Sequence, residues 1–146
     1  MVVDRSGMEH LDRDTCVQLL RQAEIGRIGL CPGEPVILPV RFQVVGDRIL
    51  FRTGRGTKLA AATSNALVAF EADHVDPTDR TGWSVLVVGH AHDASDEYRT
   101  PHERFLLARW APGDEDRIVA VDMDRVTGRR LTADAVPHLG APRRGG

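Results

Sequence analysis

The chain has 146 residues, of which 42% are hydrophobic and 27% are charged, and its formal net charge at pH 7 is -2. This length suits a single domain with one core, and the composition is that of a globular rather than a disordered chain. Nucleic acids and anionic membranes attract clustered Lys and Arg, so this charge balance gives no reason to expect either partner. A small-molecule partner is therefore expected.

Further classes of protein are excluded by the cysteines, the histidines and the N-terminus. Cys16 and Cys31 lack the paired spacing of a zinc site or a redox dithiol, and we expect buried thiols. The histidines are scattered without metal-ligand spacing, so no metal site is predicted. The N-terminus has no apolar signal stretch, and no run approaches the roughly 20 apolar residues of a membrane span, which predicts a cytoplasmic protein.

The first elements predicted in chain order are a helix and a hairpin. Residues 1–11 show no pattern and are expected to form a loose leader. Asp12 or Asp14 can cap a helix that ends near Gly26, because apolar residues recur at helical spacing: Cys16, Leu19, Leu20 and Ala23. Two strands follow around the Pro- and Gly-containing turn 31–35, because apolar residues alternate on either side of it: Ile28, Leu30, Val36, Leu38, Val40 and Phe42.

A second hairpin is predicted around Gly46-Asp47-Arg48, because Gly and Asp tolerate the backbone angles of short turns. The strand pattern stops at Gly54 and Gly56, and 57–62 is typical of a short helix. Residues 66–72 are predicted as a strand and the polar stretch 74–82 as a loop.

The C-terminal part continues with a long β-branched strand at 83–91, a helix at 98–109 and a last strand at 118–126. Beyond Leu131 the chain becomes rich in Pro, Gly and Arg, which predicts a flexible tail at 132–146. Antiparallel hairpins dominate, and no alternating strand-helix repeat supports a doubly wound parallel sheet. A small closed or nearly closed barrel is the most economical fold.

The segment from Arg52 to Lys58 has the composition of an anion site. It places three cations, two hydroxyls and two glycines between a strand and a helix start, where the backbone can approach a ligand closely. The glycine spacing is not that of the nucleoside-triphosphate P-loop, so a nucleoside triphosphatase is not predicted. Taken alone, the segment is equally consistent with a solvated basic turn.

Four strings taken in order resemble the flavin-binding family of pyridoxamine 5'-phosphate oxidase-like proteins, and within it the small actinobacterial type. They are LPVRF at 38–42, FRTGRGTKLA at 51–60, VAFEAD at 68–73 and GWSVLVVGHA at 82–91. The resemblance covers about residues 12–131. It implies a mainly β fold with flanking helices, a six-stranded antiparallel split β-barrel that forms a homodimer with two FMN molecules at the subunit interface.

The resemblance assigns cofactor contacts to nine residues: Pro39, Val40, Arg41, Phe42, Arg52, Thr53, Thr57, Lys58 and Ser84. The strand at 39–42 would lie along the isoalloxazine ring, with its main-chain groups meeting the polar edge. Arg52 and Thr53 would contact the cofactor from the strand end, Thr57 and Lys58 would bind the phosphate, and Ser84 would contact the flavin. The stretch 127–130 resembles the part that reaches the partner's cofactor.

Two functional classes remain open. The first is an oxidoreductase that uses FMN, or a deazaflavin instead, to reduce a small organic substrate, with a nicotinamide nucleotide as a candidate reductant. The second is a non-catalytic flavin carrier or sensor. No residue stands out as a general base or nucleophile, which suits a reaction carried by the cofactor. Residues 131–146 lack the basic, His-containing ending of the pyridoxal phosphate-forming oxidases, so pyridoxamine phosphate oxidation is not expected.

Overall fold

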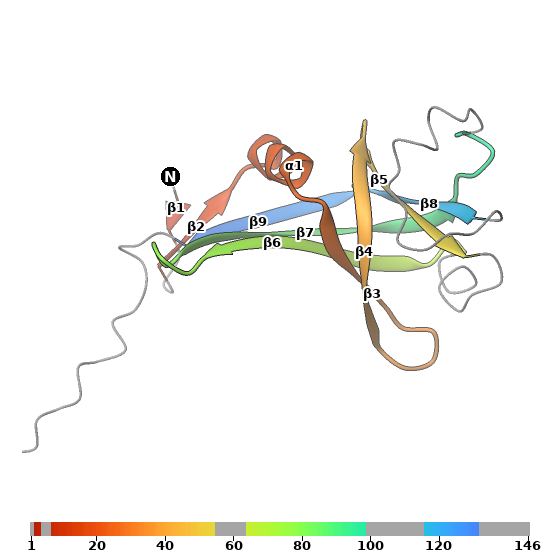
Figure 1. The fold of residues 1–146 in the computed structure, drawn as a ribbon, viewed down its shortest axis with the longest axis horizontal. Coiled ribbons are helices and arrows are strands. Elements are labelled where there is room, and N and C mark those ends of the chain that lie inside the picture. Colours follow the sequence, from red (N-terminus) through yellow and green to blue (C-terminus); the bar gives the residue numbers. More distant parts are fainter. Residues whose placement is uncertain (1, 4–6, 55–63, 99–115, 132–146) are drawn as a thin grey trace, which may run out of the picture.

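The computed structural model describes residues 2–3, 7–54, 64–98 and 116–131. Within these ranges it contains one helix and nine strands (Figure 1). The elements are β1 (Val2–Val3), β2 (Met8–Leu11), α1 (Arg13–Gln22), β3 (Ile25–Leu30), β4 (Val36–Val45), β5 (Arg48–Gly54), β6 (Leu67–Asp76), β7 (Thr81–Asp93), β8 (Asp116–Asp122) and β9 (Arg125–Leu131). No helix in the described ranges is long and apolar enough to cross a membrane.

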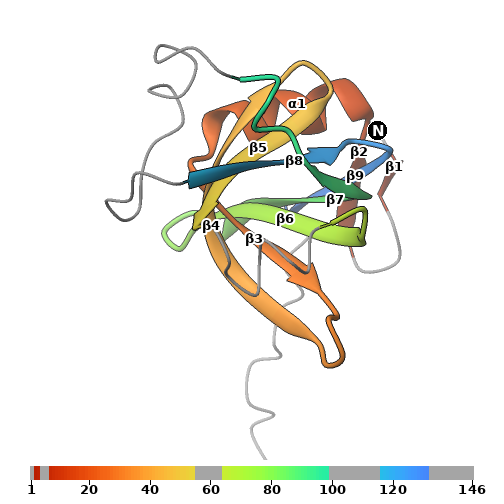
Figure 2. The same cartoon turned by 90° about the vertical axis from the view of Figure 1, so that its right-hand side faces the viewer.

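Six of the strands close into an antiparallel barrel, which confirms the predicted split barrel. The neighbours run β7-β6-β3-β4-β5-β8, and β8 pairs back with β7. Strand β7 is long enough to pair on one edge with β9 over Gly82–Val88 and with β8 over Ala91–Asp93. Strands β9, β2 and β1 then extend the sheet beyond the barrel (Figures 1 and 2).

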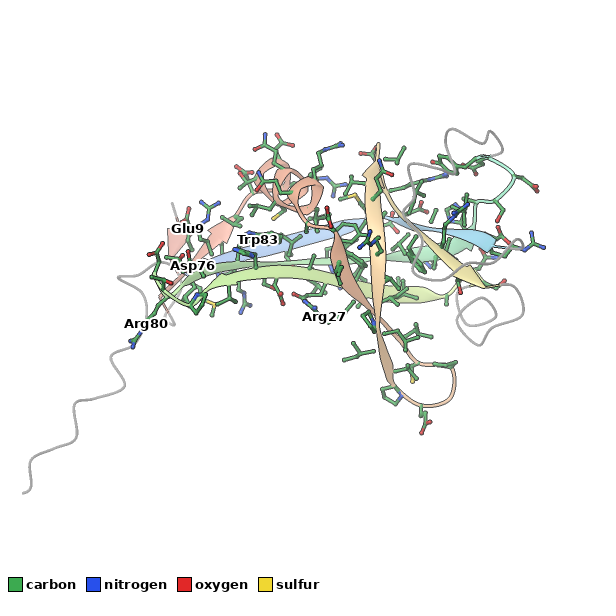
Figure 3. The ribbon with its side chains drawn as sticks, in the orientation of Figure 1. Glu9, Arg27, Asp76, Arg80 and Trp83 are labelled. Atoms are coloured by element: carbon green, nitrogen blue, oxygen red, sulfur yellow. The ribbon has the colours of Figure 1, made fainter. Side chains whose placement is uncertain are left out.

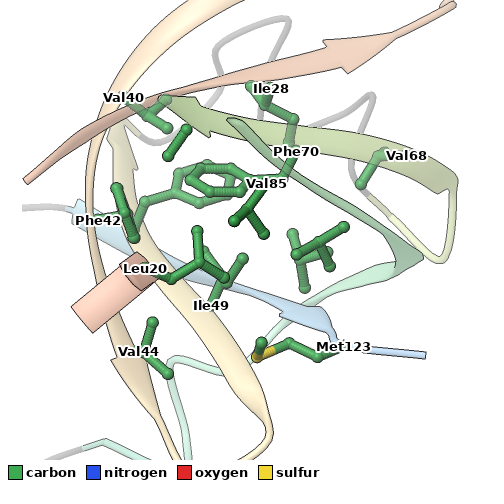
Figure 4. Packing of buried hydrophobic residues seen from close by; sticks show 14 of the residues in the cluster. Leu20, Ile28, Val40, Phe42, Val44, Ile49, Val68, Phe70, Val85 and Met123 are labelled. Atoms are coloured by element: carbon green, nitrogen blue, oxygen red, sulfur yellow. The ribbon is translucent and has the colours of Figure 1, made fainter. Parts of the chain in front are cut away.

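The barrel interior is filled by side chains from alternate positions of the strands. Strand β4 shows the pattern well, because Val40, Phe42 and Val44 are buried while their neighbours are more exposed. Phe42 packs edge-on against Phe70 of β6, with ring centroids 4.7 Å apart. Figure 4 shows this pair at the centre of the core. The interior is therefore packed, and a ligand site must lie on the outside or at an edge of the barrel.

Helix α1 covers the barrel on one side (Figures 1 and 2). It buries Cys16, Leu19 and Leu20, which belong to the barrel core. Asp12 caps its N-terminus, as predicted, and the Asp12 carboxylate accepts a hydrogen bond of 2.8 Å from the Thr15 main-chain N–H. The helix ends at Gln22, four residues before the expected end at Gly26, because β3 begins at Ile25.

We expect Asp12→Ala to lower the midpoint temperature of unfolding at pH 7, because alanine cannot accept the hydrogen bond from Thr15. That bond holds the pKa of Asp12 below its ordinary value of 3.8. A depressed pKa stabilises the fold above pH 3.8, and this stabilisation is lost as the pH falls through the lowered pKa. Calorimetry at neutral pH and in strong acid checks this, since the difference from wild type should shrink in acid. An equal difference at both pH values would contradict it.

Three expectations for the strands and turns are corrected. Residues 8–11 were expected in a loose leader, but they form β2 and pair with β9. The expected loop at 74–82 is mostly strand, because β6 and β7 remain paired up to Asp76 and Thr81. Only four residues turn between them, and the Asp76 carboxylate accepts main-chain hydrogen bonds inside this turn. The polar side chains at the ends of β6 and β7 next to this turn point to solvent, and this polar sequence led to the prediction of a loop.

The expected last strand at 118–126 is two strands. Strand β8 ends at Asp122 and β9 begins at Arg125, and the chain between them turns across β7. Cys16 is buried as expected, whereas Cys31 is exposed in the β3–β4 turn. The predicted helix at 57–62 lies outside the described residues, and so do positions 99–109 of the predicted helix at 98–109.

Candidate functional site

Strands β4 and β5 separate in the middle of the barrel. They pair from Val45↔Arg48 to Phe42↔Phe51, and beyond this point β4 pairs with β3 while β5 pairs with β8. This divergence is the split of the barrel. It leaves one edge of β4 and one edge of β5 facing each other without a shared ladder over the residues that follow.

Arg41 and Arg52 lie at this split. They are the first residues beyond the last β4–β5 pair, Phe42↔Phe51, where the two strands part. Because Phe42 and Phe51 point into the core, the two arginines leave the opposite face of the strands, and both are half-buried. The Nε–H group of each is buried and donates no hydrogen bond, while each arginine has interactions elsewhere. Two cationic side chains that flank the split favour an anionic ligand.

The other predicted residues of β4 and β5 contribute in different ways. Val40, Phe42 and Thr53 are at most 7% exposed, so they can meet an external ligand only through the main chain. The Phe42 N–H donates to Glu24 on the β3 side, so the main-chain groups of Arg41, one residue earlier, face the split. Pro39 has the same orientation as Arg41 and an exposed ring. The main chain of this strand thus borders the split.

Ser84 lies elsewhere on the molecule. It is exposed on β7, where it pairs with Asp73 of β6 on one side and with Arg129 of β9 on the other. Strands β6 and β3 lie between β7 and β4, so Ser84 is roughly 14 Å from Arg41 at about 4.8 Å per strand. A single chain therefore does not bring the two predicted contacts together. Thr57 and Lys58 lie outside the described residues.

A charged cluster beside Ser84 was not predicted from the sequence. Arg27 of β3 pairs with two carboxylates of β6, reaching Glu71 at 2.8 Å and Asp73 at 2.7 Å. The Ser84 hydroxyl donates to Glu71 at 3.4 Å. Figure 3 shows Arg27 on the face of the sheet opposite the one that carries α1 and Trp83. Only the outward position of Arg27, between buried Gly26 and Ile28, could have signalled this cluster.

The two carboxyl groups of this cluster have pKa values shifted in opposite directions. Burial raises the pKa of Glu71, and its hydrogen bond to Asp73 raises it further. The same hydrogen bond lowers the pKa of Asp73, and Arg27 adds to this effect. Asp73 is therefore the carboxylate that stays ionised, and Glu71 is the one that more readily keeps a proton.

The described residues hold no group of three or more His, Cys, Asp or Glu side chains that could bind a metal ion. His90 and His92 each approach one aspartate, at 3.7 and 4.0 Å, at the corner of β7 and β8. These pairs lie on strands away from the split.

The fold defines a split β-barrel that carries Arg41 and Arg52 where β4 and β5 part. The chain belongs to the pyridoxamine 5'-phosphate oxidase family, whose model matches residues 12–130. An uncharacterized protein of Mycobacterium tuberculosis is 37% identical over 131 residues, which cover 86% of each chain.

Two solved structures are similar throughout. The FAD binding protein from Mycobacterium smegmatis is 34% identical with a TM-score of 0.70, and the match covers 84% of this chain and 99% of that one. A putative pyridoxamine 5'-phosphate oxidase from Corynebacterium glutamicum is 30% identical with a TM-score of 0.70, over 86% of this chain and 98% of that one. The family expected from the four sequence strings is thereby confirmed.

Proposed function

We propose that this protein is a flavin-dependent oxidoreductase that binds FMN at the split and acts on a small organic substrate in the cytoplasm. The observation that carries the proposal is that Arg41 and Arg52 both lie where β4 and β5 part, with Arg52 immediately before the segment 53–58. The arginines supply charge for a phosphate, and the main chain of β4 supplies hydrogen-bonding groups for a polar ring edge. A bound flavin would supply the hydride chemistry, while the protein positions it.

We also propose that the site is completed by a second copy of the chain. Ser84 is three strands away from Arg41 within one chain, and we therefore assign the predicted flavin contact from Ser84 to a partner subunit. The outer surface of the strands offers apolar side chains for such a contact. Such a contact would cover apolar side chains that one chain leaves exposed, among them Ile37 and Leu67, which are 72% and 63% exposed.

Three alternatives concern the cofactor and the activity. A relative of 34% identity is described as an FAD binding protein, which supports FAD as the alternative to FMN. A deazaflavin is the second alternative cofactor. A non-catalytic carrier or sensor is the alternative activity, and it fits a site in which no described residue is assigned as base or nucleophile.

Titration of the purified protein with FMN, FAD and a deazaflavin, followed by quenching of cofactor fluorescence, ranks the cofactors. We expect FMN to bind most tightly. Mixing the loaded protein with a reduced nicotinamide nucleotide, with and without an organic acceptor, then separates the activities. Repeated turnover supports an oxidoreductase, whereas a cofactor that binds but is not reduced supports a carrier. Binding of none of the three would contradict the proposal.

We expect Arg41→Ala to lower the two-electron midpoint potential of the bound flavin, because a nearby positive charge stabilises the reduced, more negative form. A contribution of about 1.4 kcal/mol corresponds to about 30 mV for a two-electron couple. Spectroelectrochemical titration measures the shift, and Arg41→Lys, which keeps the charge, should stay closer to wild type. An unchanged potential in Arg41→Ala would remove this role.

A further inference from the structure

A concave site lies on the outer face of the sheet, near the β6–β7 turn. It is a pocket of about 330 Å³ between β6, β7, β9 and β2. Its apolar lining includes Met8, Val75, Trp83 and Leu131, and besides Thr81 its polar side chains are Asp73, Ser84 and Arg129. This size lies at the lower end of the range for small-molecule sites. The pocket can therefore hold one small ring rather than an extended ligand.

The three polar side chains form a row across adjacent strands. Asp73 of β6 is directly opposite Ser84 of β7, and Ser84 is directly opposite Arg129 of β9. The Ser84 hydroxyl donates its hydrogen bond to Glu71, so its oxygen can accept a hydrogen bond from a ligand. The Asp73 carboxylate stays ionised and is fixed by Arg27 at 2.7 Å. The row thus offers two hydrogen-bond acceptors side by side, followed by a donor.

We propose that this pocket binds the carboxamide-bearing ring of a nicotinamide nucleotide. The two N–H groups of a primary carboxamide match the acceptors on Asp73 and Ser84, and its carbonyl oxygen matches the guanidinium of Arg129. The ring itself packs on Met8, Val75 and Leu131. The inference rests on the proposed function: Ser84 and the stretch 127–130, which contains Arg129, are also predicted flavin contacts, so the nicotinamide ring would lie against the flavin that it reduces.

The test compares nicotinamide mononucleotide with nicotinic acid mononucleotide, which differ only in carboxamide against carboxylate. Both are used oxidised, on protein loaded with oxidised flavin, so that calorimetry measures binding alone. Wild type should bind the carboxamide about tenfold or more tightly than the acid, because Asp73 accepts from an amide and repels a carboxylate. In Asp73→Asn this ratio should fall towards one. Asp79→Asn removes a negative charge from the same hairpin outside the pocket and should keep the wild-type ratio.

Ser84→Ala provides a second variant in case Asp73→Asn disturbs the cluster around Arg27. It should weaken the carboxamide a few-fold and leave the acid unchanged. Equal binding of the two nucleotides by wild type, a ratio that survives in Asp73→Asn, or no binding of either nucleotide would overturn the inference. Flavin binding is scored separately by absorbance in the same samples. If flavin-loaded protein binds neither nucleotide, the pocket assignment is wrong and the proposed flavin site is unaffected. If the protein binds no flavin, the proposed function itself is wrong.

Discussion

Lys58→Ala should weaken FMN binding about 10- to 100-fold, because a charge-assisted hydrogen bond to phosphate contributes about 1.5–3 kcal/mol. Lys58 is four residues after Gly54, the last residue of β5, and Arg52 near this end of the strand lies at the split. Isothermal calorimetry on the purified protein measures the change. Arg52→Ala should shift the affinity in the same direction, since both cations are assigned to one site.

The matched control for this prediction is Arg125→Ala. Arg125 is an exposed cation on β9, outside the split, so its loss changes the net charge equally without touching the proposed site. FMN affinity in Arg125→Ala should remain near the wild-type value. A loss as large as that in Lys58→Ala would show that only general electrostatic attraction is involved.

Gly89→Ala should destabilise the fold by about 3 kcal/mol, the upper end of the usual cost of overpacking. Gly89 lies in β7 where the chain from β8 to β9 crosses it. A β-carbon at this position would lie 1.7 Å from the carbonyl oxygen of Asp122, so the backbone of the corner must move. The midpoint temperature of unfolding should fall by roughly 10 °C for a chain of this size.

Gly29→Ala is the matched control for the Gly89 variant. Gly29 is also a strand glycine, but a β-carbon there would only touch Ala69 at 3.8 Å. Its unfolding temperature should therefore stay equal to or slightly above that of wild type, because alanine reduces the freedom of the unfolded chain. Equal stability of both variants would contradict the close crossing at β7.

Local sequence patterns were sufficient to predict the family, the barrel and most of the strands. The alternation from Val36 to Phe42 reports one buried face directly, and the turn at Gly46 has a positive φ of 58° that glycine adopts easily. The predicted strand boundaries were wrong where the side chains are polar but the main chain is still paired with a neighbouring strand. Strand β6 continues to Asp76 because its main chain is paired with β7, although its side chains are polar there.

The boundary between β8 and β9 shows a second limit of prediction from local sequence. Alternation continues through the sequence at 118–126, and only the crossing over β7 at Gly89 requires the turn. Such a crossing depends on residues about thirty positions apart, which no local window contains.

The same limit applies to the candidate site. Family resemblance assigned Arg41 and Arg52 to one site, and the register of β4 and β5 places both directly beyond the last pair of the two strands. The cluster of Arg27, Glu71 and Asp73 depends on the pairing of β3 with β6, so the sequence could place Arg27 on an outer face but could not show its partners. The roles of Thr57 and Lys58 remain predictions.

The most direct test of the account is a parallel titration of the wild-type protein with FMN and riboflavin, which differ only in the phosphate. If the split holds the flavin through its phosphate, FMN should bind about tenfold or more tightly than riboflavin. Equal affinity for the two flavins, or binding of neither, would contradict the assignment of Arg41, Arg52 and Lys58 to a flavin-phosphate site.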